Sequence, residues 1–328
     1  MHLPTLLRFA FLLCCFCFSL WSVATERPQQ IQQVCQISGQ PCLDAVEPEL
    51  ALAKKYSLYW YQLTLYKLDS LFELQKDDEL FALSSNLIAD KQLERKSPPH
   101  FRARLYIYFA KLLYKNQNKQ ASNFYLQQAT QLLASLHQAD FNPFTMLQLI
   151  NVQMYTDTND ETGYASLLEL ETQYRKSKDP VFLYELYNNL GHYSHRLKLL
   201  HESVAHRQKA LAAIQNSNQT ARIAEANYNL ARILAYTGQW EKTLPHLQAA
   251  ERLYLAEGYE LVHNLAILHQ AEALWHTQQP ELARLQYHKV KLSLVPDYAQ
   301  VHLKRIQTLL GVATPELLPA KATNKTLR

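Results

Sequence analysis

The sequence predicts an all-α protein built from stacked helix-turn-helix units. The first observation is a forty-residue repeat between Tyr184 and Pro296, which aligns Leu190-Gly191 with Leu230-Ala231 and with Gln270-Ala271 without a gap. The second is composition, because the chain is rich in Leu, Ala, Gln and Tyr and its six glycines all stand alone. Such a composition favours helices. A repeat of this length indicates stacked units and not one closed globule.

Small side chains recur in the repeat where two helices must touch. They form three columns with a spacing of forty residues: Gly191, Ala231 and Ala271; Ser203, Thr243 and Ala283; Ala210, Ala250 and Val290. We expect these columns to be buried between the helices of each unit.

The charge balance excludes one large class of function. The net charge is +4 for the whole chain and falls to +3 without the segment that carries Arg8. Proteins that bind nucleic acid usually carry clustered basic stripes. The sequence therefore predicts no nucleic-acid partner. Isolated glycines also provide no glycine-rich phosphate loop.

The first 24 residues have the pattern of a secretory signal peptide. Arg8 precedes an apolar run from Phe9 to Leu20, and Ser22 and Ala24 stand three and one places before a cleavage site ahead of Thr25. The apolar run is short for a spanning helix, which needs about 20 residues. We expect a periplasmic or secreted protein, with an uncleaved anchor as the alternative.

Removal of the signal peptide leaves two cysteines, Cys35 and Cys42, in the N-terminal segment 25–46. In an oxidising compartment they are predicted to form a disulfide. A loop this short contributes about 2–3 kcal/mol in the chain-entropy model. The alternative is a redox pair, which usually has the Cys-x-x-Cys spacing.

Helical periodicity divides the rest of the chain. The pattern over residues 47–176 predicts divergent helical repeats, and the pattern over residues 177–296 predicts three regular ones. Their turns are expected near Lys198, Gly238 and Gln278. A capping helix over 297–311, begun by Asp297 and closed by Gly311, protects the end of the stack. The composition of residues 312–328 predicts a flexible tail.

Two segments resemble a known family. Tyr187-Asn188-Asn189-Leu190-Gly191 and Gly238-Gln239-Trp240 are similar to tetratricopeptide repeats of the forty-residue bacterial variety. The resemblance covers residues 184–296 and, in part, 102–176. It departs from the family pattern at Gln270, Arg207 and Pro280.

The resemblance implies a right-handed α-solenoid whose first helices line a concave groove for peptides or partner proteins. Similar repeats form extracytoplasmic parts of bacterial sensors, so a membrane-bound signalling protein is one expected partner. The resemblance implies no particular partner. We predict no cofactor, and the sequence does not determine the oligomeric state.

Helical spacing then selects residues of the first helices that face this groove. Tyr228 and Trp275 are the expected aromatic anchors, and Arg232 can bind a carboxylate through two hydrogen bonds. The alternative is an ordinary solvated face. The complete set is Glu185, Asn188, His192, His195, Glu225, Tyr228, Arg232, Leu268, Glu272 and Trp275.

Enzymatic chemistry has little support in the sequence. His192 and His195 lie three apart on one helical face, but a zinc site needs a third ligand, and only Glu225 of the next unit is a candidate. No Gly-x-Ser-x-Gly or His-Glu-x-x-His motif occurs. We therefore predict no catalytic residue and no metal site. The alternative function is a metal-dependent hydrolase of the cell envelope that uses this histidine pair.

Overall fold

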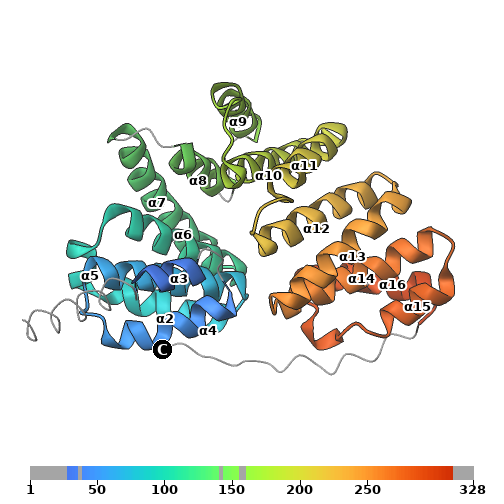
Figure 1. Ribbon diagram of the computed structural model, residues 1–328, viewed down its shortest axis with the longest axis horizontal. Helices are drawn as coiled ribbons and strands as arrows, with labels where there is room; N and C mark the ends of the chain where they lie inside the picture. Colours follow the sequence, from blue (N-terminus) through green and yellow to red (C-terminus); the bar gives the residue numbers. More distant parts are fainter. Residues whose placement is uncertain (1–27, 36–38, 140–142, 155–159, 313–328) are drawn as a thin grey trace, which may run out of the picture. The chain divides into compact units, whose positions relative to one another are not determined.

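The computed structural model of the chain describes residues 28–35, 39–139, 143–154 and 160–312. Every regular element in these residues is a helix (Figure 1). The chain divides into two compact units between Gln173 and Tyr174. The predicted signal peptide and C-terminal tail lie outside the described residues.

Helices of the first unit pack mainly against their neighbours along the chain. A short helical stretch covers 28–34. It is followed by α2 (Gln40–Leu52), α3 (Leu58–Glu73), α4 (Asp77–Ala89), α5 (Lys91–Lys96), α6 (Pro99–Lys115), α7 (Lys119–Ala139), α8 (Pro143–Gln153) and α9 (Asp160–Gln173).

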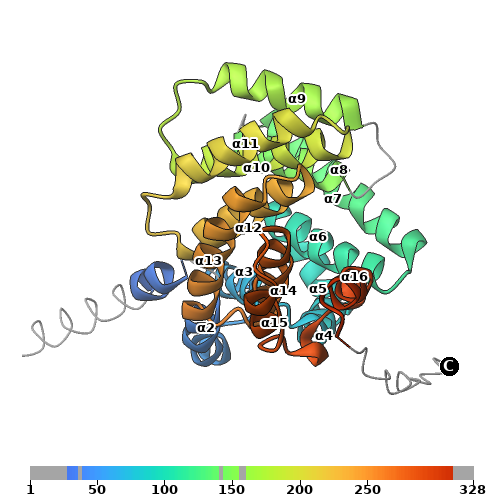
Figure 2. The ribbon, with the colours of Figure 1, turned by 90° about the vertical axis from the view of Figure 1, so that its right-hand side faces the viewer.

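The second unit is a more regular series of helix hairpins, in which α14 lies beside α13 and α15 (Figures 1 and 2). Its elements are α10 (Pro180–Arg196), α11 (Leu200–Ile214), α12 (Thr220–Tyr236), α13 (Trp240–Ala256), α14 (Glu260–His276), α15 (Pro280–Tyr287), the 3-10 turns η1 (Leu292–Leu294) and η2 (Asp297–Ala299), and α16 (Gln300–Leu310). Stacked hairpins of this kind confirm the predicted all-α solenoid class.

The hairpin turns repeat with the period of the sequence. Lys198, Gly238 and Gln278 have φ values of 63°, 75° and 60°, so each adopts the left-handed conformation. After each of them the next N–H donates to a carbonyl five residues back, at 2.8 to 2.9 Å. This is the Schellman pattern that ends a helix. The same turn occurs in the first unit at Gln75 and Gln117.

The three columns of small residues are buried, as predicted. Gly191 shows why the space is limited, because a Cβ atom there would lie 2.7 Å from Nε of Arg207 on the facing helix. The Ser203 hydroxyl donates to the Gly191 carbonyl at 2.9 Å. Close approach of the two helices in this hairpin therefore depends on small side chains at the contact.

The ends of the second unit agree only partly with the sequence. The carboxylate of Asp179 accepts hydrogen bonds from the amides of Val181 and Phe182, which caps α10. Gly311 ends α16 in a left-handed conformation with φ 64°. Asp297 does not cap α16, in contrast to the prediction. It begins η2, and α16 starts three residues later without a side-chain cap.

Near the beginning of the described chain, Cys35 and Cys42 lie within bonding distance, with Cα atoms 4.7 Å apart. Both belong to a small apolar cluster with Val46 and Leu63. The proximity of the two cysteines brings the first helical stretch next to the start of α2. In the part of the chain described, no helix has the length and apolar character needed to cross a membrane.

Candidate binding groove

The second unit contains a groove of about 640 Å³ between α12, α14 and α16. We call it the C-terminal groove. Its walls carry aromatic and ionisable side chains: Tyr228, Arg232, Tyr236, Trp240, His269, Glu272, His276, Tyr298, His302 and Arg305.

Helical spacing places the charged groups of the groove. Residues three apart on a helix lie on the same face, so His269 and Glu272 of α14 point the same way, as do His302 and Arg305 of α16. Because α16 packs against α14, the two pairs meet.

Three of these side chains converge closely, and we call His269, Glu272 and His302 the His-Glu-His trio. Nε2 of His302 lies 2.9 Å from Nδ1 of His269 and 3.3 Å from Oε2 of Glu272. Nδ1 of His269 lies 3.9 Å from the same carboxylate oxygen. The trio therefore brings two imidazole nitrogens and one carboxylate oxygen together.

Arg305 joins this trio from the solvent side. Its guanidinium donates to Oε1 of Glu272, and its Nη2 atom lies 2.9 Å from Nδ1 of His302. Arginine can only donate, so Nδ1 of His302 accepts. The proton of His302 is then on Nε2, from which it is donated toward His269.

Burial and neighbouring charges set the protonation of the trio. Burial lowers the pKa of His269, and burial together with His269 lowers the pKa of His302 to about 4. Burial by itself would raise the pKa of Glu272, but its polar surroundings, which include the paired guanidinium of Arg305, lower it overall. Since both histidines are neutral at pH 7, Arg305 is the cation that balances Glu272.

Arg232 gives the groove an excess of positive charge. It is exposed, and its guanidinium carbon lies 5.9 Å from the centre of the Tyr228 ring. No carboxylate of the described residues forms an ion pair with it. Glu272 is the one acidic side chain of the lining, and it is already paired with Arg305. The groove therefore offers an uncompensated guanidinium to a ligand.

Aromatic rings form much of the remaining surface. Tyr298 is 71% exposed, and Tyr236 is also exposed. Trp240 stacks on His276 with ring centres 4.1 Å apart. Tyr228 is only 8% exposed and packs edge-on against His269, so its ring is part of the wall.

The groove contains three of the ten residues predicted to line it, namely Tyr228, Arg232 and Glu272. Leu268 is wrong as a groove residue, because it is fully buried. Trp275 is half-buried and does not line the groove. The reason is that α14 is covered by α13, α15 and α16, which leaves only a narrow arc of it open.

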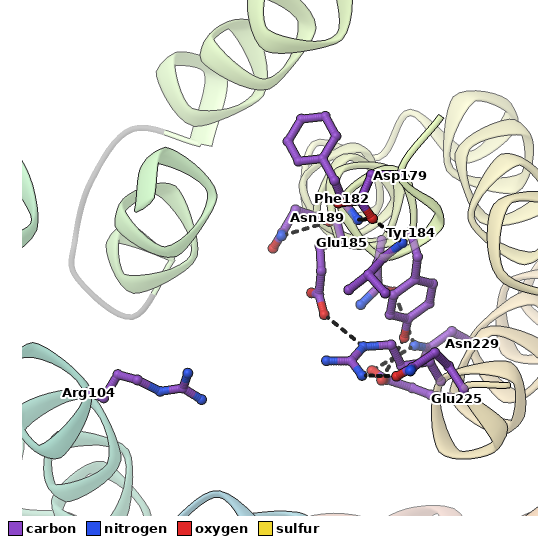
Figure 3. A network of polar contacts seen from close by, with 12 residues as sticks. Arg104, Asp179, Phe182, Tyr184, Glu185, Asn189, Glu225 and Asn229 are labelled. Carbon is purple, nitrogen blue, oxygen red and sulfur yellow. Dashed lines mark hydrogen bonds and ion pairs between the residues drawn. The ribbon is translucent and has the colours of Figure 1, made fainter. Parts of the chain in front are cut away.

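Of the other five predicted residues, two form side-chain hydrogen bonds that connect neighbouring helices. Asn188 is buried and accepts hydrogen bonds from Arg207 of α11 and Asn229 of α12. Glu225 accepts a 2.6 Å hydrogen bond from the Tyr184 hydroxyl (Figure 3). Both side chains thus contribute to the packing of neighbouring hairpins, a role that the sequence prediction did not include.

The remaining three predicted residues also lie outside the groove lining. Glu185 pairs with Arg222 at 3.3 Å. The ring of His195 lies 5.1 Å from that of Tyr236. Burial lowers the pKa of His192 well below its usual value.

Among the residues that the structure describes, no third potential ligand joins the His192 and His195 pair considered in the sequence. Within the described ranges, the trio is the one group of three or more potential metal ligands. Sequence reasoning did not identify it, although His269-x-x-Glu272 was a visible signal. The third member, His302, lies on the additional helix α16. This helix follows the last repeat, so the forty-residue spacing does not predict where its side chains lie.

Comparisons with known proteins agree on the fold and give no family. No protein-family model matches the sequence, and no curated protein is significantly similar to it. Among solved structures, a STAND signal-transduction ATPase with a tetratricopeptide repeat sensor from Pyrococcus horikoshii has a TM-score of 0.51 at 15% identity. That match covers 78% of this chain and 41% of the ATPase, so the chain spans less than half of that protein.

Two further structures are similar at lower scores. BtubC from P. vanneervenii has a TM-score of 0.48 at 12% identity, with 73% of this chain and 94% of BtubC covered. The Cut9 and Hcn1 assembly of the APC/C has a TM-score of 0.46 at 18% identity, with 81% and 52% covered. At these identities the likeness concerns the fold alone.

Proposed function

We propose that this chain is a non-enzymatic scaffold that binds an acidic segment of a protein or peptide partner in the C-terminal groove. The observation that carries this proposal is Arg232, an exposed guanidinium in a groove whose one carboxylate is already paired. Guanidinium groups bind carboxylates through two parallel hydrogen bonds. A partner with an Asp, a Glu or a terminal carboxylate complements this charge.

The aromatic lining supports a polypeptide as the ligand. Tyr and Trp are enriched among the residues that contribute most to binding at protein interfaces. Tyr236, Trp240 and Tyr298 line the same groove as Arg232. Stacked repeats commonly use such extended surfaces for binding, and the Pyrococcus protein is described as carrying its repeats as a sensor. A sensory or assembly subunit is the corresponding proposal for this chain.

We also propose that the protein acts in the cell envelope or outside the cell, after removal of residues 1–24. The pattern around Arg8 and Ala24 and the proximity of Cys35 to Cys42 support this location, since disulfides persist in oxidising compartments. Mass measurement should show a mature chain that begins at Thr25 with no free thiol. A chain that begins at Met1 or two alkylated cysteines would contradict the proposal.

The binding site is tested by affinity purification of the tagged protein from an envelope fraction. Tyr228 is kept, because it packs in the wall of the groove, and Arg232→Ala is combined with Tyr298→Ala. We expect this variant to remain folded and to lose at least about 30-fold in partner affinity, since residues that dominate an interface contribute about 2 kcal/mol or more.

Arg252→Ala provides the matched control, because Arg252 is an exposed arginine of α13 outside the groove. This variant should bind the partner as the wild type does. Binding to the wild type should also weaken as salt is raised, because the attraction is between charges. A partner that the Arg232→Ala, Tyr298→Ala variant retains at full affinity would exclude the groove as its site.

A further inference from the structure

We propose that the His-Glu-His trio binds a divalent transition-metal ion of the zinc class through Nδ1 of His269, Oε2 of Glu272 and Nε2 of His302. The site lies in the C-terminal groove, within the second unit. It differs from the His192 and His195 pair considered in the sequence, and its test requires no protein partner.

The spacing of the three ligand atoms fits a tetrahedral ion. Zinc bonds of about 2.0 to 2.1 Å at tetrahedral angles place ligand atoms roughly 3.4 Å apart. In the trio the three separations are 2.9 Å, 3.3 Å and 3.9 Å. An ion between these atoms requires only small movements of the two imidazole rings.

The chemistry of the ligands selects the class of metal. Two imidazoles and one carboxylate suit zinc and its neighbours in the first transition row, whereas calcium and magnesium prefer oxygen ligands. Three protein ligands leave a fourth position for water or for a ligand group. Because the trio lines the groove, a carboxylate bound there could occupy this position.

The site is supported by its helices. His269 and Glu272 are fixed on α14 by their separation of three residues, and α16 packs against this helix. Glu272 is only 2% exposed. A carboxylate with so little solvent needs a positive partner, since burial of an unpaired charge costs several kcal/mol. Arg305 is that partner in this structure, and a metal ion can take its place.

Arg305 is the competitor of the metal. Coordination by Nε2 of His302 moves the ring proton to Nδ1, where it would face the N–H of Arg305. Two donors cannot share that position, so Arg305 must leave the ring when the metal binds. Its side chain is 59% exposed and can turn into solvent. Arg232 adds a second positive charge to the groove, which also opposes a cation.

Competition between Arg305 and the metal ion leads to a specific prediction. Replacing Arg305 by alanine removes a cation that occupies both Glu272 and His302, so metal affinity should increase roughly tenfold. A surface role for Arg305 alone would not change metal affinity in this direction.

Zinc affinity is measured by calorimetric titration of the full mature chain after treatment with a chelator, and Co²⁺ is used as a spectroscopic probe. We expect one Zn²⁺ per chain and visible Co²⁺ absorption typical of four-coordinate sites. His302→Ala and Glu272→Gln should each lower zinc affinity at least about 100-fold, because even outer-shell changes cost 10- to 100-fold. Circular dichroism verifies that each variant is folded.

His276→Ala is the matched control, since His276 lies on α14 and lines the groove but does not belong to the trio. It should bind zinc as the wild type does. The proposal is overturned if the folded wild type binds neither Zn²⁺ nor Co²⁺, or if His302→Ala binds them with unchanged affinity. His302→Ala keeps the exposed Arg232, so this variant should lose zinc binding and still capture the partner. The two proposals can therefore be tested separately.

Discussion

The hydroxyl of Tyr184 on α10 donates a 2.6 Å hydrogen bond to Oε2 of Glu225 on α12 (Figure 3). The two residues are 41 positions apart, one more than the length of the repeat, and belong to the first helices of consecutive hairpins. Asn229 and Asn188 make a similar contact at 3.3 Å. The facing sides of α10 and α12 are therefore connected by side-chain hydrogen bonds. These bonds are directional, in contrast to the apolar packing of the repeat.

Loss of the Tyr184 hydroxyl should destabilise the second unit. Tyr184 is almost fully buried, and its partner is a carboxylate. Hydrogen bonds to charged groups contribute about 1.5–3 kcal/mol, so Tyr184→Phe should lower the free energy of unfolding by this amount. Urea denaturation measures the change. Tyr236→Phe, which removes an exposed hydroxyl, should change stability by less than about 0.5 kcal/mol. Equal effects of the two substitutions would refute the role of this bond.

Local features of the sequence predicted the helices and turns well. The turns at Lys198, Gly238 and Gln278 were placed correctly, because each depends on a few adjacent residues that recur with a fixed period. The small residues between the helices were placed for the same reason. Departures from the family pattern were also informative. Arg207 fills the space opposite Gly191, and Gln270 bonds to Glu251 at 2.6 Å.

The three turns provide a prediction in which only the backbone matters. In the left-handed region, a residue other than glycine is less stable than glycine by about 1–2 kcal/mol. Glycine also has greater conformational freedom in the unfolded chain, which reduces this difference by about 0.5–1 kcal/mol. Lys198→Gly and Gln278→Gly should therefore each stabilise the second unit by about 0.5–1 kcal/mol. Thermal and urea unfolding measure the effect.

Gly238→Gln is the reverse test of the same argument. Nothing lies within 4 Å of a Cβ atom placed at Gly238, so the substitution introduces no clash and only changes the backbone preference. It should destabilise the second unit by a similar amount. The explanation fails if glycine at 198 and 278 lowers stability or if Gly238→Gln raises it.

Candidate site residues were harder to predict than the fold. Leu268 and Trp275 were assigned to the groove from helical spacing, which describes one helix and does not include what packs on its other sides. The burial of Leu268 follows from the packing of three helices around α14. His302 could not be placed, because α16 follows two 3-10 turns that interrupt the repeat. Its meeting with His269 is a tertiary contact between residues 33 positions apart.

That contact predicts how stability depends on pH. His302 faces Arg232 on α12, His269 and Glu272 on α14, and Arg305 on its own helix. Burial and the adjacent His269 lower its pKa from 6.5 to about 4. Between these two values the unfolded chain binds more protons than the folded chain. Stability therefore increases with pH across this window and is lost as the pH falls from about 6.5 to about 4.

The size of this contribution can be isolated with His302→Gln. One pKa unit corresponds to about 1.4 kcal/mol, so a pKa lowered from 6.5 to about 4 means that protonation of His302 should cost the folded chain about 3 kcal/mol below pH 4. In the presence of a chelator, we expect the unfolding free energy of His302→Gln to vary less between pH 6.5 and pH 4 than that of the wild type. His276→Gln, an exposed histidine of the same groove, should follow the wild type. Parallel pH profiles for His302→Gln and the wild type would show that His302 is not held neutral by its neighbours. The same result would contradict the assigned protonation of the trio and would leave the proposed role of Arg232 in partner binding unaffected.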